Sequence, residues 1–174
     1  LGHDNMLWRL TAQRLLVDGG YKQAVPALTK LLSRPAPESL HALWALHGLG
    51  ALEAQSHAKC LVSRDPALRR NAVRALPHDL KGQQMLHDGA TLADENLLVR
   101  LASFVKLASF PRDEGTRDIA SLLMRVDENA KDEWLRIPLQ ALGAEEANLV
   151  GYEKGPNLLP NPSFESPDGK LPRG

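Results

Sequence analysis

One pattern recurs five times along this chain, and it constrains the fold more than any other feature of the sequence. Each copy opens with a residue that favours a helix start, places a leucine three residues later, and sets a basic residue close behind it. The copies begin at Asp4, Pro37, Asp65, Asp94 and Asp132, which lie 28 to 38 residues apart. Each interval has room for two short helices, so the spacing predicts an array of stacked helical hairpins.

The copy at residues 65–77, DPALRRNAVRALP, indicates how one repeat is built. The Asp65 carboxylate suits an N-cap because it can accept a hydrogen bond from a free backbone N–H, and the proline that follows suits the first helical position. Leu68, Ala72 and Ala75 share one face at helical spacing, and the alanines allow close approach of a second helix. We therefore predict a capped helix that buries this face against its neighbours.

Apolar segments between these starts predict the partner helices of the hairpins. They cover residues 21–33, 51–62, 80–87 and 116–126. Pro26 lies inside the first of them, and we expect it to kink or locally shift that helix. No strand-like alternation appears before residue 145. The sequence thus predicts an all-α superhelix, a solenoid of about four to five helix pairs in which neighbouring pairs bury each other.

The end of the chain has a different character. Residues 151–174 contain five prolines and four glycines, a composition that disfavours helix. We predict a helical repeat domain over residues 1–145. Residues 146–174 are expected to form a linker and tail that are irregular or extended within this chain.

Composition narrows the classes of function. Lysine plus arginine and aspartate plus glutamate both number 21, so the chain lacks the net positive charge of a general nucleic-acid binder. No apolar run approaches the ~20 residues of a membrane span. No nucleophile elbow, phosphate loop or dinucleotide fingerprint is present. His57 and Cys60 could share a helix face, but zinc needs at least three protein ligands. We therefore expect no catalytic residue, cofactor, metal or membrane segment.

Basic side chains of the repeats are the main candidates for an interaction surface. Equivalent positions of stacked repeats form a row, so these side chains would line a groove for an anion or a protein partner. In the alternative, which we favour, each arginine pairs with an acidic group or caps carbonyls of an adjacent repeat. The candidate surface comprises Arg69, Arg70, Arg74, Arg100, Arg136 and Trp134.

Three tryptophans, Trp8, Trp44 and Trp134, lie near the starts of first helices. An aromatic row would suit a sugar or a proline-rich peptide, but we expect these side chains to fill space between repeats. Trp134 has charged neighbours, and we expect it to be the most exposed of the three.

The segments DPALRRNAVRAL and DENLLVRLASFVKLA resemble HEAT-type repeats, so the expected solenoid is HEAT-like. The order HDNMLWRLTAQRLL, AVPAL, HALWALHGLGAL and RRNAVRALP also resembles one region of large secreted, membrane-bound-dehydrogenase-like, haem-binding proteins of planctomycete and verrucomicrobial bacteria. In that family HEAT repeats follow a β-propeller, and a c-type cytochrome module often comes after. The haem signature Cys-x-x-Cys-His is absent at Cys60, so no haem-binding residue is carried over.

The segment NLLPNPSFE, residues 157–165, resembles the opening strand of carbohydrate-binding jelly-roll modules. This resemblance implies that residues 146–174 form a linker and the truncated start of a β-module that follows in a longer protein. Any glycan would bind only through that missing module.

The resemblances imply a non-catalytic scaffold or protein-interaction segment of a multidomain extracytoplasmic protein, either periplasmic or secreted. Its expected partners are the flanking domains or another protein. Three alternatives stay open: a carbohydrate-associated module of a sugar-oxidising protein, an enzyme in which a loop such as 77–94 closes over a pocket, and nucleic-acid binding along an arginine ladder.

Overall fold

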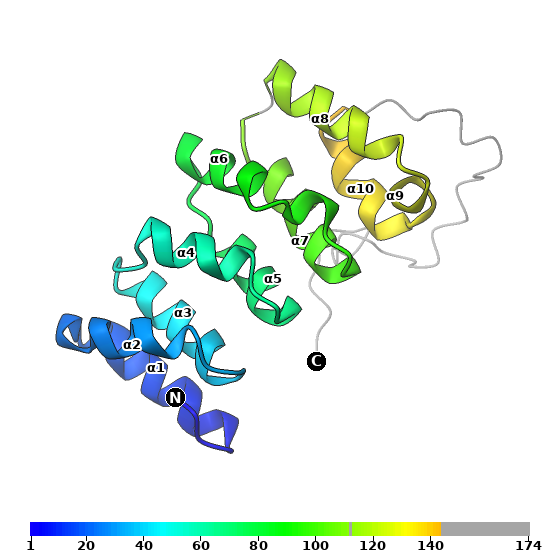
Figure 1. The fold of residues 1–174 in the computed structure, drawn as a ribbon. Helices are drawn as coiled ribbons and strands as arrows, with labels where there is room; N and C mark the ends of the chain where they lie inside the picture. The colour runs from blue at the N-terminus through cyan, green and yellow to red at the C-terminus, as the bar shows by residue number, and fades with distance from the viewer. Residues whose placement is uncertain (112, 144–174) are drawn as a thin grey trace, which may run out of the picture.

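The computed structural model describes residues 1–111 and 113–143, and every regular element in them is helical (Figure 1). The prediction of an all-α chain is confirmed for these residues, in which no strand forms. The α-helices are α1 (Met6–Asp18), α2 (Val25–Leu31), α3 (Glu38–Gly48), α4 (Ala54–Leu61), α5 (Pro66–Arg74), α6 (Leu80–Asp88), α7 (Leu97–Ala108), α8 (Glu114–Met124), α9 (Asp127–Lys131) and α10 (Glu133–Ala141). Two short 3-10 helices, η1 (Lys22–Ala24) and η2 (Thr91–Ala93), complete the described elements.

Five of the helices pack against one another in succession, in the order α1, α3, α5, α7 and α10. A second group covers them: α2 packs on α3, α4 on α5, α6 on α7, and α8 with α9 on α10. Figure 1 shows the helices progressing from α1 at one end to α10 at the other. Each helix of the first group except α1 is therefore covered by the helix or helices that precede it in the chain.

Buried apolar side chains join the two groups of helices. The larger cluster includes Leu43, Leu61, Leu68, Phe104 and Leu139, which come from α3, α4, α5, α7 and α10. A smaller cluster around Leu28 and Leu46 joins α2 to α3. Full burial of such a side chain contributes about 1.5–3 kcal/mol. Packing between helices, rather than any single helix, therefore stabilises the fold.

Four side-chain N-caps show where copies of the sequence repeat begin in the structure. Asn5, Asp65, Asn96 and Asp132 each accept a hydrogen bond from a backbone N–H in the first turn of α1, α5, α7 and α10. The predicted caps Asp65 and Asp132 are confirmed, whereas the predicted starts at Asp4 and Asp94 are wrong by one and two residues. In all four copies the arginine lies four residues after the cap.

The predicted partner helices are present with shifted ends. Segments 51–62, 80–87 and 116–126 correspond to α4, α6 and α8, whereas segment 21–33 is divided into η1 and α2. Pro26 lies in the first turn of α2, so the expected kink inside a helix is wrong, whereas the alternative of a local shift is borne out by the change from the 3-10 helix η1 to α2 just before it. The first-turn N–H groups have no acceptor within the helix, and a proline there removes no hydrogen bond.

The expected domain boundary at residue 145 and the predicted tail over 146–174 lie outside the described residues, as does the jelly-roll-like segment 157–165. Within the described part of the chain, no helix is both long enough and apolar enough to cross a membrane.

Candidate interaction surface

The guanidinium group of Arg69 is fully engaged within the fold. Its Nε and Nη2 donate to the Asp94 carboxylate at 2.6 and 2.8 Å, and Nη1 donates to the Ser63 carbonyl at 2.8 Å. The Arg69 and Asp94 side chains are only 11% and 7% exposed. The hydrogen bond to Asp94 raises the pKa of Arg69, and such two-point pairing fixes both partners. Arg69 therefore links α5 to the segment before α7.

The pKa of Asp94 is shifted in the opposite direction. Burial alone would raise the pKa of its carboxyl group, but the hydrogen bonds from Arg69 and from the Asn96 backbone N–H, with the charges of Arg69 and Arg100, lower the pKa below its usual value. Asp94 is thus held ionised as the partner of Arg69, which is why it does not cap α7.

Arg9 and Arg100 repeat this arrangement. Nη1 of Arg9 donates to the His3 carbonyl, and Nη1 of Arg100 donates to the Asp94 carbonyl, both six residues earlier in the chain. Another nitrogen of each reaches the next repeat: Arg9 Nε donates to His41 Nε2 at 3.2 Å, and Arg100 Nη2 donates to Glu128 at 3.3 Å. Arg69 and Arg100 thus pair with acidic groups, as favoured from the sequence, whereas the partner of Arg9 in the next repeat is a histidine. The carbonyls that the three arginines hold belong to the turn leading into their own helix.

The remaining candidate arginines divide into two kinds. Arg136 on α10 is buried, with 6% of its surface exposed. Arg70 is half-buried, its Nε has no hydrogen-bond partner, and Arg74, one turn further along α5, is exposed. Neither Arg70 nor Arg74 forms an ion pair within the described residues. These two guanidinium groups are the ones on the candidate surface that remain available to a ligand.

Exposed apolar side chains continue the same register on the next two helices. Arg70 and Arg74 lie five and nine residues after their N-cap, where α7 has Leu101, which is partly buried against the core, and exposed Val105, and α10 has exposed Ile137 and Ala141. Because α5, α7 and α10 pack side by side, equivalent positions face the same way. We call the resulting surface the partner face. It comprises Arg70 and Arg74 of α5, Leu98 and Val105 of α7, and Trp134 and Ile137 of α10.

The tryptophans occupy three different environments. Trp134 is 68% exposed, and the expectation that it is the most exposed of the three is confirmed. Trp44 is half-buried, and its indole N–H donates to the Asn71 side chain at 2.9 Å, which joins α3 to α5. Trp8 is 59% exposed, so the expected packing between repeats is wrong for both Trp8 and Trp134.

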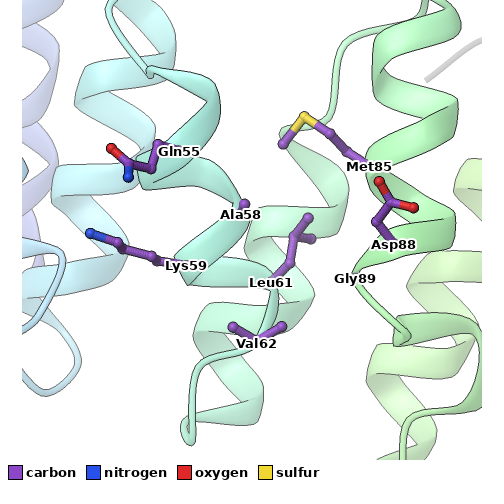
Figure 2. Close-up of a pocket in the computed structure, with 8 residues that line it drawn as sticks. All are labelled: Gln55, Ala58, Lys59, Leu61, Val62, Met85, Asp88 and Gly89. Carbon is purple, nitrogen blue, oxygen red and sulfur yellow. The ribbon is translucent and has the colours of Figure 1, made fainter.

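A groove lies on the other side of the molecule, between α4 and α6 (Figure 2). Its volume is about 350 Å³. Ala58 and Leu61 of α4, with Val62 just beyond it, face Met85 of α6 across the groove, and Lys59 and Asp88 bring opposite charges to its rim. The lining is mainly apolar and is open to solvent, which suits a hydrophobic side chain better than a polar substrate.

A cluster that the sequence analysis missed surrounds Lys106. This side chain is 6% exposed, and its Nζ donates to the Leu76 carbonyl just beyond α5 and lies 3.2 Å from His78 Nε2. Burial lowers the pKa of Lys106. The Ser109 hydroxyl donates to the Lys106 carbonyl at 2.6 Å. An ammonium group at this point caps the carboxyl end of α5. A lysine inside the apolar run LASFVKLASF is the signal that points to it.

His57 and Cys60 face the core. His57 Nε2 lies 2.7 Å from the Ala72 carbonyl, and burial lowers the pKa of this imidazole. Burial raises the pKa of the Cys60 thiol to about 11, so the thiol stays protonated at neutral pH. Over residues 1–111 and 113–143, no group of three or more His, Cys, Asp or Glu side chains is placed to hold a metal ion.

No protein-family model matches the chain, and no curated protein is significantly similar to it in sequence. The partner face therefore rests on the geometry of the described residues alone.

Proposed function

We propose that this chain is a HEAT-like solenoid segment that serves as a non-catalytic scaffold and binds a protein partner on the partner face. The observation that carries the proposal is the pair of arginines without acidic partners, Arg70 and Arg74, beside exposed apolar side chains of α7 and α10.

Three features support the solenoid. The first-group helices pack in succession, each beside the next. The interval from N-cap to arginine is the same in α1, α5, α7 and α10. Arg9, Arg69 and Arg100 each hold a carbonyl six residues earlier and also reach the following repeat. Recurrence of one contact at one register is what repeats that stack on their neighbours require.

The chemistry of the partner face supports a protein ligand. Leu98, Val105, Trp134 and Ile137 are each about half or more exposed. Apolar side chains at this exposure favour contact with another apolar surface, and tryptophan and arginine often dominate binding energy at protein interfaces. We propose that an amphipathic peptide or helix lays its apolar side on α7 and α10. Its acidic residues would then meet Arg70 and Arg74 on α5.

Nucleic acid is a weaker candidate for this surface. A ladder for phosphates needs a row of accessible arginines. Arg69, Arg100 and Arg136 are largely buried, which leaves two accessible guanidinium groups on α5.

The resemblance in sequence extends the proposal to the longer protein. We propose a secreted or periplasmic multidomain protein in which the helical segment connects its flanking domains. A carbohydrate would contact the β-module that residues 157–165 resemble, rather than the helices.

Peptide selection tests the partner face. Peptides selected from a random library on the immobilised chain are expected to combine apolar residues with aspartate or glutamate. Trp134→Ala should weaken binding of a selected peptide about tenfold or more, measured by fluorescence anisotropy. Arg74→Ser should weaken it less and reduce its salt dependence, because one of the two arginines on the face is lost. Lys81→Ser, on α6, is the control that should leave binding unchanged. Selected peptides that bind all of these variants equally would refute the proposal.

A further inference from the structure

α1 differs from the other first-group helices because no helix covers it within the described residues. Its Trp8 and Leu15 are 59% and 60% exposed, together with Met6, Leu7 and Leu10 on the same helix. Trp8 and Leu15, seven residues apart, form one exposed apolar face of α1 at the end of the stack, whereas Met6 and Leu10 lie on the opposite side of the helix. The helix that follows α1 in the chain, α2, packs on α3.

The positions equivalent to Trp8 and Leu15 are buried in other first-group helices. Trp8 and Leu15 lie three and ten residues after the α1 N-cap. The residues at these two positions are buried in three other helices: Leu68 and Ala75 after α5's cap, Val99 and Lys106 on α7, and Leu135 and Leu142 after α10's cap. In α5 the covering helix is α4, and Leu68 shares a core cluster with Cys60 and Leu61 of that helix.

The turn before α1 repeats the turn that joins α4 to α5. Nη1 of Arg9 donates to the His3 and Asp4 carbonyls at 2.6 and 2.7 Å. Nη1 of Arg69 donates to the equivalent carbonyls, those of Ser63 and Arg64, at 2.8 and 3.3 Å. The chain thus enters α1 along the path by which α4 leads into α5.

This equivalence places Leu1 where Leu61, the last residue of α4, stands. Four residues separate Leu61 from the start of α5, and the same number separate Leu1 from the start of α1. Leu1 is partly buried and packs against the cluster that contains Leu28 and Leu46. A helix ending at this residue would run directly over Trp8.

We propose that the Trp8–Leu15 face of α1 is a docking site for an amphipathic helix that leads into Leu1 and packs on α1 as α4 packs on α5. The register defines the helix that would dock here. Its apolar stripe meets Trp8 and Leu15, and its outer side is polar. The helix would continue the row formed by α2, α4, α6 and α8. The inference rests on the proposed stacking of repeats but not on the partner face.

The test compares three versions of the chain by hydrogen exchange at the α1 amides. The first consists of residues 1–174. The second is extended upstream of Leu1 by the residues that precede it in the longer protein, far enough to include one more helix. The third carries a copy of residues 53–61 whose final leucine takes the place of Leu1. Both extensions should slow exchange in α1 about tenfold or more. They should not change exchange in α7.

Variants make the test specific to this face. Trp8→Ser combined with Leu15→Ser should abolish the slowing in both extended versions, whereas Leu98→Ser on the partner face should preserve it. The proposal would be overturned if the extension by the preceding residues left amide exchange in α1 unchanged. It would also be overturned by concentration-dependent protection of α1 in the unextended chain with a dimer in sedimentation, because a second copy would then be the occupant. Peptide binding to the partner face, measured on the same versions, separates failure of this inference from failure of the proposed function.

Discussion

α1 and α5 have nearly the same local design and very different packing. Both begin at a side-chain N-cap, and both carry an arginine that holds the carbonyl six residues earlier. Yet α1 has no buried residue, whereas Leu68, Ala72 and Val73 of α5 are buried. The cap and the arginine contact are made within a few residues of sequence, so they form in both. Burial depends on neighbours, and α5 has α3, α4 and α7 around it.

Of the equivalent substitutions in α1 and α5, the one at the arginine should give the largest difference in the free energy of unfolding. Arg69→Ala leaves the buried Asp94 carboxylate without its partner, and we expect a loss of about 3–5 kcal/mol in the free energy of unfolding. Arg9→Ala removes a contact to neutral His41 near the surface and should cost about 1 kcal/mol. Urea denaturation followed by circular dichroism measures both. Equal effects would mean that the Arg69–Asp94 pair is not coupled to the core.

The position three residues after the cap should give the next largest contrast. Leu68→Ala removes a fully packed side chain, and we expect it to lower the free energy of unfolding by about 2–5 kcal/mol. Trp8→Ala removes a larger side chain that is mostly exposed, and the change should stay within about 0.5 kcal/mol. A thermal denaturation series gives the comparison directly. A large cost for Trp8→Ala would show that its face is already covered in this chain.

The caps should differ less. Asp65→Ala should lower global stability by about 1 kcal/mol, because α5 belongs to the cooperative core. Asn5→Ala removes the same kind of hydrogen bond, but α1 is expected to open locally, so its effect should appear as faster amide exchange in α1 rather than as a lower unfolding midpoint. Asp65→Ser and Asn5→Asp are the matched controls that retain a cap.

The smallest effect is a pH dependence confined to α1 and α3. His41 accepts a hydrogen bond from Arg9, and its Nδ1 lies 2.8 Å from the Gln13 side-chain oxygen. Burial, with the charges of Arg9 and the amino terminus, lowers the pKa of His41 below 6.5. The unfolded chain therefore binds this proton first, and the contribution of His41 to stability is present above about pH 6.5 and lost as the pH falls through the folded pKa.

Exchange protection of α1, corrected for the intrinsic rate at each pH, should decrease between about pH 7 and about pH 5. His41→Gln should remove most of that decrease. The Arg69–Asp94 link should persist over this range, because the pKa of Asp94 is lowered and its carboxylate stays ionised. Parallel loss of protection in α1 and α7 would trace the effect to another group, such as buried His57.

The sequence predicted what depends on short-range pattern. The helical character, the caps Asp65 and Asp132, and the exposure of Trp134 follow from spacing, capping chemistry and charged neighbours. The role of Asp94 could not be read in this way, since its partner Arg69 lies 25 residues away and pairs with it only once α5 and α7 pack. The same holds for the Lys106 contact with Leu76, 30 residues apart. The expected burial of Trp8 was wrong because a residue at a core position is buried only if another helix covers it.

The arginine contact of the repeats also determines where this chain can change length. From Asp65 to Asn96 the interval is 31 residues, and from Asn96 to Asp132 it is 36, the longer one containing the extra helix α9. α10 nevertheless packs on α7 with its arginine four residues after the cap. Insertions and deletions are thus absorbed by the covering helices and their loops. The distance from cap to arginine thus stays constant, while the segment between successive first-group helices varies in length.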